Sequence, residues 1–294
     1  MSVLVCENLT KIYKNKEVIK NFSYNFLDNK VYAIIGKTDS GQHELLDIIS
    51  AKTKPTEGEI YLDGINLINN DRINDRICYI ASNTNFPHYM RIIDIFKLMA
   101  KFYPNWDTYY AYELLCHFGI SHQTNFGKLT ENEKSLIISI MGLASRAHIT
   151  ILDNPVEKVD IKDRYDFFNF LYHHQEKYPR TFIITTSFID EIDYLVDFLL
   201  LLDKGRLIAS FSIEEMKENF RYLTGKTEVL KSLIAGVKII GVEERGKMLT
   251  ICIRQKLKKD EIRKYQKYLI KISEVPIQMI FIYLINLREL KGLS

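Results

Sequence analysis

The sequence predicts an α/β fold, with a mostly parallel sheet followed by a small α+β appendage. Short apolar runs alternate with segments of helical periodicity from residue 31 to residue 202, a pattern typical of parallel sheets. Beyond Ser210 this alternation stops. From Lys217 onward there are 17 Lys and Arg against 8 Asp and Glu, so this part carries +9 and the preceding part −6. We therefore expect two domains, residues 1–215 and 216–294.

Composition narrows the class of protein. A chain of 294 residues that is 47% hydrophobic has enough apolar material for one large or two modest cores. The four cysteines (Cys6, Cys78, Cys116 and Cys252) show no C-x-x-C pairing or metal-ligand spacing. No secretion signal opens the sequence, and its most apolar windows are far shorter than the ~20 residues that cross a bilayer. We expect a reduced cytoplasmic environment and no membrane span.

The first half of the chain predicts strands and helices in a definite order. We expect strands at 3–6, 18–26 and 31–35, the last ending in Gly36, and then a helix over 42–50. Residues 92–118 have helical periodicity with many aromatic side chains, so they belong to a packed helical subdomain spanning about 88–145.

The second half continues the alternation and then changes character. The expected elements of the first domain are a helix at 131–144, a strand at 148–152, a helix at 164–173, a strand at 181–185, a helix at 190–196 and a strand at 198–202. Those of the appendage are a helix at 213–220, strands at 237–241 and 249–254, and helices at 259–272 and 277–290.

A basic segment, residues 257–271, has Ile262, Tyr265 and Leu269 at helical spacing. This pattern predicts an amphipathic helix with a solvated basic face. Contact with acidic lipid headgroups or with nucleic acid is the alternative interpretation.

Residues 36–43 lie where a phosphate-binding loop would lie, between a strand and a helix N-terminus. Such a loop needs backbone amides, a lysine for the phosphates and a hydroxyl for Mg²⁺. Here the lysine position holds Gln42, which has no charge, and the hydroxyl position holds His43, a poor ligand for a hard cation.

The rest of the loop is mixed. Gly36, Ser40 and Gly41 keep its small-residue character, whereas Asp39 adds a negative charge where a third glycine is common. Lys37 is not the phosphate lysine, because it directly follows the strand instead of opening the helix. We expect ATP or ADP to bind weakly or not at all, and Mg²⁺ not to be held in the standard way.

Two downstream segments strengthen this interpretation. The strand ending at residue 152 is followed by Asp153 and Asn154, where Asp153 stands at the Mg²⁺-orienting position and Asn154 replaces the acid that positions water. Before the helix at 131–144 stands a second segment, and it aligns with the signature L-S-G-G-Q: Leu129, Thr130, Glu131, Asn132 and Glu133. Glu131 and Asn132 occupy its two glycine positions.

The order and spacing of these motifs resemble the ATP-binding subunits of ABC transporters over residues 1 to about 215. The resemblance implies that Tyr13 stacks on adenine, although it is equally well a surface tyrosine beside a strand. It places Ser82 at the Q-loop glutamine, Asp160 in the D-loop and Ser187 at the switch histidine. Asp153 is equally well a cap for the turn that follows it. No catalytic residue is therefore intact.

Residues 101–107 and 154–156 further resemble a Gram-positive exporter branch that includes the phenol-soluble modulin transporter. That branch implies export of amphipathic or antimicrobial-type peptides.

The resemblance implies a peripheral subunit at the cytoplasmic face of the membrane, bound to transmembrane permeases and a second, competent ATPase subunit, with no specific nucleic acid. A homodimer would set Gln42 and His43 against Glu131 and Asn132, and the Glu131 carboxylate would repel a triphosphate. Three outcomes stay open for the nucleotide: complete loss, weak binding without turnover, and appreciable hydrolysis. A regulatory or adaptor protein that keeps the fold as a binding platform is the alternative function.

Overall fold

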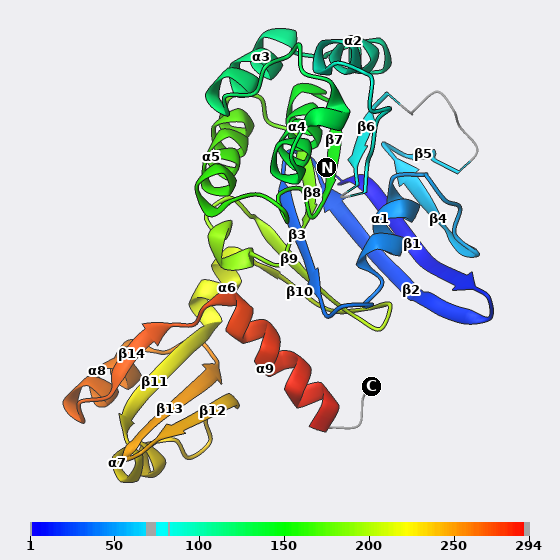
Figure 1. Ribbon diagram of the computed structural model, residues 1–294. Helices are drawn as coiled ribbons and strands as arrows, with labels where there is room; N and C mark the ends of the chain where they lie inside the picture. The colour runs from blue at the N-terminus through cyan, green and yellow to red at the C-terminus, as the bar shows by residue number, and fades with distance from the viewer. Residues whose placement is uncertain (1, 69–74, 82, 291–294) are drawn as a thin grey trace. The chain divides into compact units, whose positions relative to one another are not determined.

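The computed structural model describes residues 2–68, 75–81 and 83–290 (Figure 1). Ser82, one of the predicted site residues, lies outside them. Contacts divide the chain into two compact units, Met1–Ser210 and Phe211–Ser294. Within the described parts of the chain, no helix is both long and apolar enough to cross a membrane.

The first unit contains two sheets. The antiparallel sheet has the order β2-β1-β4-β5, formed by β1 (Ser2–Tyr13), β2 (Lys16–Leu27), β4 (Glu57–Leu62) and β5 (Ile65–Asn66). The second sheet has the order β10-β9-β3-β8-β7-β6, and its described pairings from β9 to β6 are parallel. Its strands are β3 (Val31–Gly36), β6 (Ile77–Ile80), β7 (Ile149–Asp153), β8 (Thr181–Thr185), β9 (Phe198–Asp203) and β10 (Arg206–Ser212).

Helices cover both faces of the parallel sheet, so its central strands are nearly continuous apolar runs. Helix α1 (Gln42–Ile49) packs with the two sheets in one core, against the face that carries Ile149 and Ile151. Because successive side chains alternate, Thr150 and Leu152 point to the other face, where Gly142 of α4 (Glu131–Ala144) approaches both side chains.

Two further helices of the first unit lie within residues 88–145, the expected helical subdomain, and a third follows it in the sequence. Helices α2 (Ile92–Phe102) and α3 (Thr108–His117) lie beyond the end of the sheet, and α5 (Ile161–Lys177) lies beside α4 (Figure 1). The α/β fold with a parallel sheet is confirmed.

The helix expected at 190–196 is wrong. The segment forms a 3₁₀ turn, Ile189–Glu191, followed by further turns, with i→i+3 bonds from Ile192 N to Ile189 O (3.1 Å) and from Leu195 N to Ile192 O (3.0 Å). Ile189, Ile192 and Leu195 are nevertheless buried. Apolar spacing therefore identified the buried side chains but not the backbone that presents them.

The second unit has an antiparallel sheet with the order β12-β13-β11-β14. Its elements are α6 (Ile213–Asn219), β11 (Phe220–Lys226), α7 (Thr227–Leu233), β12 (Ile239–Arg245), β13 (Met248–Arg254), α8 (Lys259–Lys267), β14 (Lys271–Glu274) and α9 (Ile277–Leu290). Leu230 of α7 and Tyr265 of α8 share a core with Leu223 and Ile251 on one face. On the other face, Tyr283 of α9 packs on Gly241, where any side chain would collide with its ring.

The helix expected at 259–272 is too long, because α8 ends at Lys267. Leu269 takes a left-handed φ of 57°, and Ile270 N donates to Tyr265 O (2.9 Å). These features cap the helix and start β14. Strands β11 and β14 and helix α7 were not predicted.

A buried histidine near the end of α5 makes stability depend on pH. His174 is 3% exposed, and neither ring nitrogen finds a partner among the described residues. Burial, followed by the charges of Arg180 and Arg146, lowers the pKa of His174 from its ordinary 6.5 to about 3. Between these two values the unfolded chain binds more protons than the folded chain, so protonation destabilises the fold.

We predict that stability falls as the pH drops from about 6.5 toward 3, with a slope contribution of about 1.4 kcal/mol per pH unit from His174. The measurement is urea unfolding at several pH values for wild type and His174→Phe, whose slope should be shallower by this amount. His173→Phe, on the exposed side of the same helix, is the control. Equal slopes for wild type and His174→Phe would contradict the prediction.

Candidate functional site

The predicted site residues converge where parallel strands end. Strands β3, β8 and β7 are consecutive neighbours, so Gly36, Thr185 and Asp153 finish at one edge of the sheet. Ligands of open α/β sheets bind at this edge, because loops there leave the strands and helices begin.

The loop after β3 is a closed turn. Ser40 N donates to Lys37 O (3.0 Å), and Gly205 N donates to Ser40 O (2.8 Å). Gly41 has φ 93°, and a Cβ there would lie 2.7 Å from Val18 O, so only glycine fits. Asp39 also takes a left-handed φ, of 62°. The backbone thus keeps a compact turn leading into α1.

Gln42 points back into the fold. Its Nε2 donates to the carbonyl of Ile34 in β3 at 2.8 Å. A side chain held in this way braces the loop against its own strand. It offers no positive charge to a ligand above the loop.

His43 and Asp153 form the central contact of the site. His43 Nδ1 lies 2.7 Å from Asp153 Oδ2, and Asp153 Oδ1 accepts from Thr185 Oγ1 at 2.7 Å. Asp153 is 3% exposed. Both of its carboxylate oxygens are therefore engaged by side chains of this chain.

Tyr79 and Asp47 surround the same histidine. Tyr79 Oη lies 3.5 Å from His43 Nδ1, and Asp47 Oδ2 lies 3.8 Å from His43 Nε2. Burial, with added repulsion from the charges of Asp153 and Asp47, raises the pKa of Tyr79, which therefore stays protonated.

Asn154 turns back toward the aspartate beside it. Its Nδ2 donates to Asp153 Oδ1 (3.4 Å), and its backbone N donates to Thr185 Oγ1 (3.0 Å). Ser187 is exposed in the turn after β8. Within the described ranges, no group of three His, Cys, Asp or Glu residues could hold a metal ion. His43 offers a ring nitrogen where that Mg²⁺ site would need a hydroxyl oxygen, and its Nδ1 already contacts Asp153, so these side chains do not fit the site.

The signature-like segment, residues 129–133, contacts the segment that follows β7. Leu129 is buried, and Thr130 caps α4 in a capping box with Glu133. Asn132 Nδ2 donates to Asp160 Oδ2 (3.1 Å), a contact that the sequence did not predict.

Glu131 binds two lysines, Lys134 at 2.8 Å and Lys158 at 3.2 Å. Their hydrogen bonds lower its pKa, so the carboxylate is ionised and charge-compensated. The expectation that Glu131 strongly repels a triphosphate is revised, because the sequence did not place Lys158 beside it.

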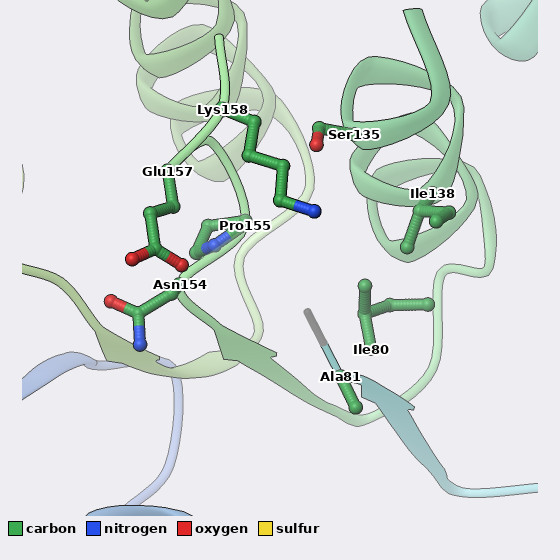
Figure 2. A pocket seen from close by; sticks show the side chains of 8 residues that line it. All are labelled: Ile80, Ala81, Ser135, Ile138, Asn154, Pro155, Glu157 and Lys158. Carbon is green, nitrogen blue, oxygen red and sulfur yellow. The ribbon is translucent and has the colours of Figure 1, made fainter. Parts of the chain in front are cut away.

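A small pocket separates these two segments (Figure 2). Figure 2 shows Asn154 and Lys158, from the segment after β7, on one side of the pocket and Ile138 of α4 on the other, with Ile80 at the end of β6. Lys158 and Ser135 were not predicted as site residues. Lys158 lies in the segment matched to the D-loop, but nothing in the sequence indicated that the packing of α4 on β6 and β7 brings it near Ser135.

A larger pocket, of about 490 Å³, is lined by residues of the loop, β2, α1 and the turn after β9. Its lining mixes both signs of charge: Lys16, Glu17, Val18, Lys20, Asp39, Gly41, Glu44 and Lys204. Tyr13 is not among these lining residues. It is 45% exposed, and Lys11 Nζ lies 5.0 Å from the centre of its ring. The three lysines were missed because they come from a strand and a distant turn.

Comparison with known proteins finds similarity to ABC transporter ATP-binding proteins. The family model described as ABC transporter matches residues 19–157. The ATP-binding protein YtrB of Bacillus subtilis (strain 168) is 21% identical over 215 residues, 72% of this chain and 73% of YtrB. These matches support an ABC transporter ATP-binding subunit.

Other relatives and solved structures agree with the cassette assignment. The bacitracin transport ATP-binding protein BcrA of Bacillus licheniformis is 22% identical, over 76% of this chain and 74% of BcrA. A solved dimeric cassette bound to ADP and phosphate has a TM-score of 0.64 at 21% identity, covering 71% of this chain and 98% of its own. That structure shares the cassette fold.

The contacts of Asp153 give a matched test of the site's geometry. We predict that Thr185→Val destabilises the cassette by about 2 kcal/mol, because a buried carboxylate loses a hydrogen bond. Thr150→Val on neighbouring β7 is the control. Its hydroxyl is also buried but has no partner among the described residues, so its loss should cost close to nothing. Denaturant unfolding measures both, and equal losses would refute the assignment.

Proposed function

We propose that this cassette is a catalytically impaired nucleotide-binding subunit of a bacterial ABC transporter. One observation carries the proposal: the side chains at the nucleotide edge bind one another. Gln42 binds the carbonyl of Ile34, and His43 binds Asp153, which also accepts from Thr185. A triphosphate would find Gln42 at the position of the family's phosphate lysine and His43 at the position of its Mg²⁺-binding hydroxyl.

The expected loss of catalytic rate favours the absence of ATP hydrolysis. Removing a single preorganised transition-state donor costs about 10²–10³ in rate. Here Asn154 replaces the water-positioning acid and Ser187 the switch histidine. Weak ATP or ADP binding through Tyr13 and the loop amides remains compatible with the fold, because the turn around Gly41 is kept.

The partners and the place of action follow from the family. We propose a peripheral position at the cytoplasmic face of the membrane, with transmembrane permeases and a competent ATPase subunit. The name of BcrA, a bacitracin transport protein, supports export of amphipathic or antimicrobial-type peptides. The same hydrogen bonds among the site's own residues also support the adaptor alternative, because a protein that serves only as a binding platform does not need to hydrolyse ATP.

We predict that the purified chain hydrolyses ATP no faster than a blank, and that Asn154→Glu alone restores nothing. Phosphate release with and without Mg²⁺ measures this hydrolysis. Robust Mg²⁺-dependent turnover by the wild-type chain would overturn the proposal.

We expect Gln42→Ala to leave any ATP affinity nearly unchanged, because Gln42 is turned toward Ile34. Calorimetric titration with ATP measures this affinity and separates weak binding from none.

We predict that the chain is recovered from native membranes with a second, competent ATPase subunit. A partner can supply the missing lysine, acid and histidine, whereas a homodimer brings Gln42 and His43 to both sites. Mass determination of the detergent-solubilised complex decides the matter. A homodimer of this chain with permease and no other ATPase would rule out the pairing, and a complex without permease would favour the adaptor.

A further inference from the structure

One end of the second unit's sheet gathers basic side chains around an exposed leucine. Strand register places Lys226 and Arg245 beside Met248, and Lys271 opposite Thr224, so β11 and β12 finish where β13 and β14 begin. Leu269 leads directly into β14 at this end. We call this surface the Leu269 end.

Leu269 projects an apolar side chain into solvent. It is 90% exposed, the adjacent Tyr268 is 50% exposed, and Met248 at the same end of the sheet is 44% exposed. Leu269 occupies the left-handed position of a helix C-cap: Leu269 N donates to Gln266 O (3.0 Å) and Ile270 N to Tyr265 O (2.9 Å). Glycine is the usual residue there, so a leucine adds backbone strain and gains no packing within the described fold.

The charge at this end is positive and largely uncompensated. Lys226, Lys247, Lys267 and Lys271 are exposed and have no ion-pair partner among the described residues. Two other basic residues are paired, Arg245 with Glu243 (3.4 Å) and Lys231 with Glu244 (4.0 Å). Glu228 is the remaining acid nearby, while Asp260 and Glu261 belong to the first turn of α8, at its far end.

We propose that the Leu269 end docks on an anionic phospholipid surface. Lysines at a membrane surface are attracted to acidic headgroups, and an aliphatic side chain between them inserts at the acyl boundary. Tyr268 has the amphipathic ring that favours the headgroup level. Leucine has no face for stacking on bases and no hydrogen bond for their edges, so nucleic acid fits this surface less well. The proposal does not depend on how the cassette handles nucleotide.

The test is flotation of the full chain with vesicles of phosphatidylcholine alone or mixed with phosphatidylglycerol. We expect binding to the mixed vesicles only, weakening as salt rises. Lys267→Gln/Lys271→Gln should weaken binding about 25-fold, from ~1 kcal/mol per basic residue near the surface. Lys238→Gln/Lys259→Gln makes the same charge change at the opposite end and should leave binding unchanged.

Leu269→Gly separates docking from folding. Because glycine suits the cap, the thermal midpoint should stay equal or rise, while vesicle binding falls about tenfold, roughly the equivalent of burying half a leucine side chain. Equal binding to neutral vesicles, or equal losses for the two lysine pairs, would overturn the proposal. So would a lowered midpoint for Leu269→Gly, or binding to single-stranded RNA through the Leu269 end without vesicle binding.

Discussion

The parallel pairing of β3, β8 and β7 is the constraint on which the candidate site depends. It brings Gly36, Thr185 and Asp153 to one edge, although they are far apart in the sequence. His43, at the start of α1, then meets Asp153 across 110 residues of chain. Tyr79, Asp47 and Thr185 lie around that contact.

The elements with strong periodicity could be predicted from the sequence. The helix Glu131–Ala144 and the strand Thr181–Thr185 agree residue for residue, because each is a long or continuous buried pattern ended by a clear signal. Helix α8 was extended too far because Leu269 continues the apolar spacing. Its exposed, left-handed position is set by the cap, which periodicity does not report.

The site was predicted as a set of positions, but not as a set of contacts. Motif spacing predicted that His43 and Asp153 belong to one site, and the structure places both at one edge of the sheet. It gave no sign that His43 binds Asp153 or that Gln42 turns inward, because these depend on side-chain packing between distant segments. Likewise Lys158 reaches Glu131 only because α4 packs beside the turn after β7, and this contact changes the local charge that the sequence suggested.

The capping box of α4 has a consequence for any anion that approaches this helix end. A helix N-terminus attracts anions because its first amides lack intrahelical partners and its dipole is positive there. In this chain the Thr130 hydroxyl accepts from Glu133 N, and the Glu133 carboxylate accepts from Thr130 N. The helix therefore carries its own internal counterion, and a phosphate would compete with side chains already tethered in place. The amides of Thr130 and Glu133 at this helix end therefore already have hydrogen-bond partners within the chain, without a partner subunit.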